Sequence, residues 1–113
     1  MAIRTILYEL EAKLKPTSGG FFSKPSGKLE RKSYEDQTER LKIAVRNIKV
    51  PDGTVVKVTA DGKEILGLPI NDGRGKYDEE SKSSATFPAL ELNQTIGIII
   101  DGEVILSGII KED

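Results

Sequence analysis

The sequence predicts an all-β, antiparallel domain spanning residues 1–113, built as a two-sheet β-sandwich of about seven or eight short strands. Glycine-containing turn dipeptides recur along the chain at intervals of roughly ten residues. Asp-Gly is favoured in tight hairpins because both residues tolerate positive φ. Between the turns, apolar and polar residues alternate, as in a strand with one face on a core. The dipeptides are Asp52-Gly53, Asp61-Gly62, Asp72-Gly73 and Asp101-Gly102, preceded by Gly19-Gly20 and Ser26-Gly27.

The opening segment predicts a strand over residues 6–14. Its apolar residues also fit one face of a helix, and its Glu and Lys residues are good helix formers. Alternation fits at least as well, because Ile6, Tyr8, Leu10, Ala12 and Leu14 share one strand face. No cap residues frame a helix, so the helix is kept as the alternative.

Residues 16–27 are rich in Gly, Ser, Pro and Lys and predict a loop. Its adjacent Phe21 and Phe22 cannot both point inward, so we expect one to cover an open end of the sandwich and the other to be partly exposed. Residues 28–49 carry seven basic and four acidic side chains. Because these charges are mixed and no aromatic nucleic-acid motif accompanies them, we interpret the stretch as a solvated sheet face and predict no nucleic-acid partner.

Alternation predicts three further strands at residues 41–46, 55–60 and 66–70. Pro69 has no N–H to donate to a neighbouring strand, so the last of these is expected at a sheet edge or at the end of its pairing. The expected inward residues are Leu41, Ile43, Val45, Val56, Val58, Ala60, Leu66, Leu68 and Ile70.

The C-terminal hairpin, residues 94–111, is apolar on both expected faces. Strict alternation sets Ile99 against Ile96, Ile98 and Ile100, and sets Ile105 and Ile109 against Val104, Leu106 and Ile110. A strand with one solvated face should be polar there, and an uncovered apolar strand promotes aggregation. We therefore predict that the face with Ile99, Ile105 and Ile109 is covered by the Phe21–Phe22 loop or contacts another copy or a partner protein.

The composition restricts the chemistry. Cysteine and histidine are both absent, which removes thiolate nucleophiles, the commonest general base and the commonest zinc ligand. We predict no enzyme activity, no cofactor and no metal site. Charges among the first fifteen residues differ from a signal peptide or a membrane span. We expect a cytoplasmic protein without a membrane partner, or an exported one if a signal peptide has been removed.

Some polar motifs match known sites weakly. Asp72 with residues 78–80 offers oxygen ligands for calcium, without the spacing of an EF-hand. Residues 72–76 could form an anion-binding nest, without the helix that follows a phosphate-binding loop. We interpret both as solvated turns. For carbohydrate binding, Tyr8 and Phe87 are expected in the core, which leaves Tyr34, Tyr77 and one phenylalanine of the loop exposed.

Five short segments, Leu10–Leu14, Pro25–Lys28, Val50–Thr54, Gly73–Gly75 and Ile105–Gly108, occur in an order that resembles a group of small proteins. The group is a loosely defined set of uncharacterised bacterial β-rich domains with an "LPDGT" turn and a C-terminal "ILSG" strand. The resemblance spans nearly the whole chain through motifs of low specificity. It implies a β-rich fold, with immunoglobulin-like topology as an inference, and transfers no catalytic residue. The charged residues 76–80 depart from the alternating strand of the group.

Three functions follow as hypotheses. The first is a non-catalytic binding or self-assembly module that contacts another copy, or a partner protein, through the C-terminal hairpin. The second is a module for a small ligand, a carbohydrate or an anion, held by the loops with Phe21, Phe22, Arg74 and Tyr77. The third, which we rank last, is a small hydrolase built on carboxylate, Lys or Ser groups.

Overall fold

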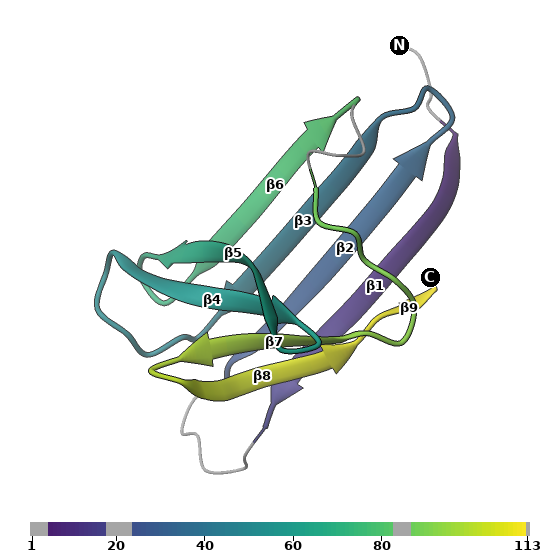
Figure 1. The fold of residues 1–113 in the computed structure, drawn as a ribbon. Coiled ribbons are helices and arrows are strands. Elements are labelled where there is room, and N and C mark those ends of the chain that lie inside the picture. The colour runs from purple at the N-terminus through teal and green to yellow at the C-terminus, as the bar shows by residue number, and fades with distance from the viewer. Residues whose placement is uncertain (1–4, 18–23, 83–86, 113) are drawn as a thin grey trace.

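The computed structural model describes residues 5–17, 24–82 and 87–112. The described residues form strands joined by turns and loops, without a helix (Figure 1). The prediction of an all-β antiparallel fold is therefore confirmed. The strands are β1 (Ile6–Pro16), β2 (Ser26–Tyr34), β3 (Glu39–Arg46), β4 (Thr54–Ala60), β5 (Lys63–Ile70), β6 (Gly75–Ser81), β7 (Thr95–Ile100), β8 (Glu103–Ile109) and β9 (Lys111–Glu112).

Three of the four predicted Asp-Gly turns have positive φ at both central residues. The φ angles are 50° and 83° at Asp61-Gly62, 53° and 73° at Asp72-Gly73, and 49° and 77° at Asp101-Gly102. This is the geometry whose twist matches a pair of antiparallel strands. At Asp52-Gly53 only the glycine has positive φ, and the Thr54 N–H donates to the Pro51 carbonyl at 3.1 Å.

The strands follow one continuous path, β5-β4-β7-β8-β1-β2-β3-β6, and β9 pairs with β1. We call β6-β3-β2-β1 with β9 sheet A, and β5-β4-β7-β8 sheet B. The terminal strands β5 and β6 are joined by the turn at Asn71–Arg74, so the sheet is a nearly closed barrel rather than two separate sheets. Its order also differs from an immunoglobulin domain, where the second strand lies between the first and the fifth.

Strand β1 joins the two layers because it pairs with β2 from Ile6 to Leu14 and then with β8 at Lys15 and Pro16. Gly108 of β8 makes this crossing close. A Cβ atom at that position would overlap the carbonyl oxygen of Lys13, so only glycine allows the two backbones to approach there.

The core lies between the two layers. The inward residues predicted for residues 41–46 and 55–60 are all buried, and on β5 Leu68 and Ile70 are buried while Leu66 is half-buried against the core. The opening segment is a strand, with Leu10, Ala12 and Leu14 buried. β5 is the last strand of the path, as Pro69 predicts. These four expectations are confirmed.

The connection from β6 to β7 crosses the inner face of sheet A (Figure 1). It contributes buried Phe87 and Leu90 to the core, and the prediction for Phe87 is confirmed. The predictions for two tyrosines are wrong: Tyr34 is buried, whereas Tyr8 is 41% exposed because it lies near the open end of β1.

Candidate functional site: the outer face of sheet B

The outer face of sheet A is charged in nearly every position, as predicted for the stretch from residue 28 to 49. The strand register aligns its side chains in rows that cross β1, β2, β3 and β6. Two successive rows are Glu9, Lys32, Arg40 and Glu80, followed by Glu11, Glu30, Lys42 and Asp78. Ion pairs join Lys32 to Glu9 at 3.6 Å and Arg40 to Asp78 at 2.7 Å. Such a face is fully compatible with water and needs no cover.

Arg40 and Asp78 form the best-defined pair on this face. The Arg40 guanidinium donates to both oxygens of Asp78, from Nε at 2.8 Å and from Nη2 at 2.7 Å. These hydrogen bonds lower the pKa of the Asp78 carboxyl below its ordinary value of 3.8. The pair links β3 to the terminal strand β6, which has no other neighbour for most of its length in the described sheet.

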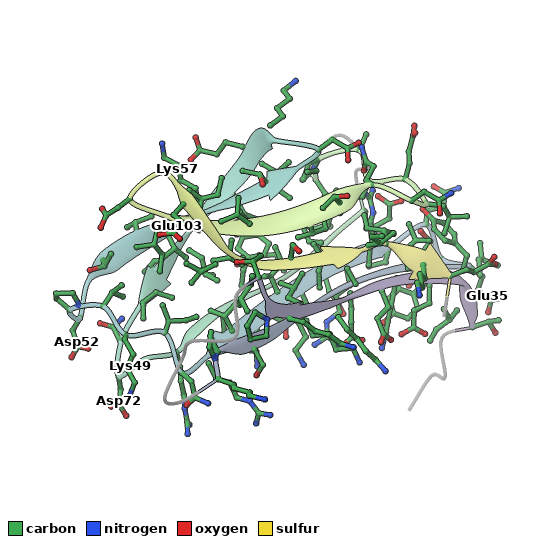
Figure 2. All side chains as sticks on the ribbon, turned by 90° about the horizontal axis from the view of Figure 1, so that it is seen from below. Glu35, Lys49, Asp52, Lys57, Asp72 and Glu103 are labelled. Atoms are coloured by element: carbon green, nitrogen blue, oxygen red, sulfur yellow. The ribbon has the colours of Figure 1, made fainter. Side chains whose placement is uncertain are left out.

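The outer face of sheet B has the opposite character. In register, Lys57 of β4 lies beside Ile99 of β7, which lies beside Val104 of β8. Val55 is 59% exposed and Val104 is 41% exposed. Figure 2 shows Lys57 on the sheet B side of the molecule, away from sheet A. Ile109, 51% exposed, is on the same face of β8, and Ser107 lies between it and Val104.

Two irregularities in β8 decide which hairpin residues face outward. Ile98 pairs with Leu106 and Ile99 pairs with Val104, so Ile105 is an extra residue in a bulge. Ile105 therefore packs against the core together with Leu106. The strand ends at Ile109, and the next residue, Ile110, turns inward and is buried. The prediction that Val104 shares a face with Leu106 is wrong.

The residues predicted for self-association are thus placed differently from one another. Ile99 is half-buried on the outer face of sheet B, and Ile109 is exposed there. Ile105 is half-buried on the opposite side and lines a cavity of about 210 Å³ together with Ile100 and Val50. Val55 and Val104 belong to the apolar face although the sequence did not single them out. Alternation would have found Val55, and the bulge hid Val104.

The residues predicted for ligand binding are not gathered in one place by the described structure. Phe21 and Phe22 lie outside the described residues. Arg74 is exposed in the turn before β6, and Tyr77 is half-buried on β6 and packs against the core. The Asp72 N–H of this turn donates a hydrogen bond to Oδ1 of Asp52, in the loop before β4, at 2.8 Å. Figure 2 shows Asp52 and Asp72 close together at this end of the molecule.

One buried polar cluster was missed from the sequence. Arg31 points inward from β2 with only 5% of its surface exposed. Its guanidinium donates from Nη1 to the Pro88 carbonyl at 2.6 Å and from Nη2 to Glu39 Oε2 at 2.8 Å. Arg31 is in phase with Leu29, and Glu39 is in phase with Leu41. Two opposite charges at inward positions of neighbouring strands were the available signal.

Within the described ranges, no three His, Cys, Asp or Glu side chains gather closely enough to hold a metal ion. We find no helix there with the length and apolar character that a membrane crossing needs. No protein-family model matches the chain, and no curated protein is similar to it. The resemblance to the group of bacterial β-rich domains stays a prediction.

Proposed function

We propose that this chain is a non-catalytic binding module that self-associates through the outer face of sheet B. One observation carries the proposal: four apolar side chains, Val55, Ile99, Val104 and Ile109, lie on the outer face of sheet B with Lys57 and Thr95 as polar neighbours, while the outer face of sheet A is charged. Exposed apolar faces of this kind mark interaction surfaces.

The size of the face indicates a weak contact. Val55, Val104 and Ile109 are each about half exposed, so burying what remains contributes about 1 kcal/mol per side chain. A two-fold dimer buries the same face on both copies. Association itself costs at least about 4 kcal/mol. These values leave a net gain of only about 2 to 4 kcal/mol, so we expect dimers to form only at about millimolar concentrations or above, and the contact to depend visibly on concentration.

Lysine substitutions on the apolar face test the proposal. We expect the wild-type mass from light scattering coupled to size exclusion to rise with concentration. Val104→Lys and Ile109→Lys should abolish that rise, because each would bury an unpaired charge in the contact. Ile105→Lys is unsuitable, since Ile105 packs against the core. Leu7→Lys is the matched control, because Leu7 is 65% exposed on β1, outside sheet B.

A wild type that stays monomeric across the accessible concentration range would refute self-association. Loss of the dimer in Leu7→Lys, with the dimer retained in Val104→Lys and Ile109→Lys, would move the contact away from sheet B.

A further inference from the structure

The outer face of sheet A carries a second feature that self-association does not use. Below its two mixed-charge rows, the register places Lys13 of β1 opposite Lys28 of β2, Lys28 opposite Ala44 of β3, and Ala44 opposite Lys76 of β6. One residue pair further along, Ser26 lies opposite Arg46, and Lys15 follows Lys13 on the same strand face. We call Lys13, Lys15, Lys28, Arg46 and Lys76 the basic rows.

The basic rows differ from the neighbouring rows in lacking acidic partners, although like charges also stand opposite one another in those rows, at Glu11–Glu30 and Lys32–Arg40. Like charges directly opposite one another destabilise an antiparallel pair, yet Lys13 stands opposite Lys28. Higher on the same face, Lys32 and Arg40 have acidic partners. Among the described residues, the ion pairs leave out Lys13, Lys15, Lys76 and Arg46. Four of the five cations of the basic rows therefore have no acidic partner at ion-pair distance in the described structure, which leaves them available to an anionic ligand.

Lys28 is the one member of the basic rows with acidic partners. Its Nζ lies 3.5 Å from Glu30 Oε1 and 3.5 Å from Glu11 Oε2. These contacts hold the Lys28 side chain toward Glu30 and Glu11. The charge of Glu30, and to a smaller extent that of Glu11, raises the pKa of the Lys28 ammonium group. Ala44 and Ser26 lie among the longer cations, and Arg46 donates a hydrogen bond from Nε to Ser26 Oγ at 3.0 Å.

The basic rows continue into a groove at the seam between the layers. A cavity of about 510 Å³ is lined by Lys13, Lys15, Lys111, Ser107 and Gly108, and also by Glu11, Glu112 and Ile109. The groove lies where β8 pairs with β1 at Lys15 and Pro16 and β9 pairs with it at Leu10 and Glu11, with the close approach of Gly108 to Lys13 between the two. Lysine ammonium groups and a serine hydroxyl are donors suited to phosphate or sulfate oxygens.

We propose that the basic rows and this groove bind a linear polyanion that carries phosphate or sulfate groups and no bases. Neighbouring strands are about 4.8 Å apart, and successive outward residues about 7 Å apart. The cations are therefore spaced so that several of them can contact successive anionic groups of one polymer at the same time. Nucleic acid is disfavoured, since single strands are held by stacking on aromatic side chains. In the described part of the chain Tyr34 and Phe87 are buried and Tyr77 packs inward, while Tyr8, 41% exposed, lies five residues before Lys13 on β1.

The probes are long-chain inorganic polyphosphate, heparin and a thymidine oligonucleotide, each titrated at low ionic strength and followed by calorimetry. We expect polyphosphate, heparin or both to bind, and added salt to weaken binding steeply. Binding of polyphosphate alone would identify a phosphate chain, and binding of heparin alone a sulfated glycan. The whole chain has a formal charge of −1, so its net charge does not favour polyanions.

Two double variants with the same change in net charge locate the site. Lys13→Gln/Lys76→Gln should weaken binding about twentyfold, taking roughly fivefold for each lysine lost near a dense anionic surface. Lys57→Gln/Lys63→Gln, on sheet B, should leave it within about twofold of the wild type. The proposal is overturned if neither polyphosphate nor heparin binds, if both double variants lose binding equally, or if the oligonucleotide binds more tightly than both.

Discussion

Arg31 shows how one residue fixes a long connection. It is the only charged side chain among the described residues that is buried, and it ties the Pro88 carbonyl of the β6–β7 connection to Glu39 of β3. Ser33 adds a hydrogen bond to the same carboxylate at 3.3 Å. The Nε atom of Arg31 has no partner in the described structure. The cluster therefore positions the connection more than it stabilises the fold, because burying a charge is costly even when it is paired.

Removing the arginine alone should be severe. Arg31→Met leaves Glu39 without its cation in a mostly buried place, and we expect a loss of about 3 kcal/mol in the free energy of unfolding. Arg31→Met/Glu39→Leu removes both charges and should recover most of that loss. Chemical denaturation of both variants gives the two values. Equal losses in the single and double variants would show that the pair itself, and not the stranded carboxylate, sets the cost.

The lowered pKa of Asp78 predicts that part of the stability of the fold is lost in acid. Its pKa in the folded chain lies below the ordinary value of 3.8 because Arg40 donates hydrogen bonds to it. The contribution is therefore complete above that ordinary value and is lost as the pH falls through the lower, folded value. The melting temperature of the wild type should fall over this acidic range more than that of Asp78→Asn. Parallel melting curves for the two proteins would contradict the assignment.

At the level of elements, the crossing of β8 over β1 depends on Gly108. Gly108→Ala would drive a methyl group into the Lys13 carbonyl, which belongs to the backbone and cannot rotate away. We expect a loss of about 2 kcal/mol or more in the free energy of unfolding, measured by denaturant titration. Gly67→Ala is the control, because its new Cβ meets only Cγ1 of Val55, at 2.8 Å, and that side chain can turn. A similar loss in both variants would argue against a special role for the crossing.

The elements that were predicted well are those decided by neighbouring residues. The Asp61-Gly62, Asp72-Gly73 and Asp101-Gly102 turns follow from the φ that these residue types tolerate. The prediction of the two faces of the C-terminal hairpin was wrong for a different reason. The bulge at Ile105 is set by the pairing of β7 with β8, and no residue type in the sequence indicates it. One added residue exchanges the two faces of a strand, so Val104 and Ile105 were assigned to the wrong sides.

At the level of the whole molecule, the predicted sandwich and the observed barrel share strands, turns and core. What separates them is the partner that β1 takes at its end, and sequence patterns do not report strand order. The candidate surfaces were harder still to predict. The apolar face gathers residues from β4, β7 and β8, and the basic rows gather residues from β1, β2, β3 and β6. Only the register brings either set together.

The pairing of β1 also sets an order for folding during synthesis. β1, β2 and β3 are consecutive along the chain and pair side by side, so they can form a meander as soon as they leave the ribosome. The partners of β1 at its other edge, β8 and β9, are made after every other described strand. Until they emerge, the nascent chain holds β1 with one bare edge and a half-covered core. A stall late in translation would leave that edge open to pairing with other chains. The synthesis of β8 and β9 is therefore the step at which a chaperone has most to protect.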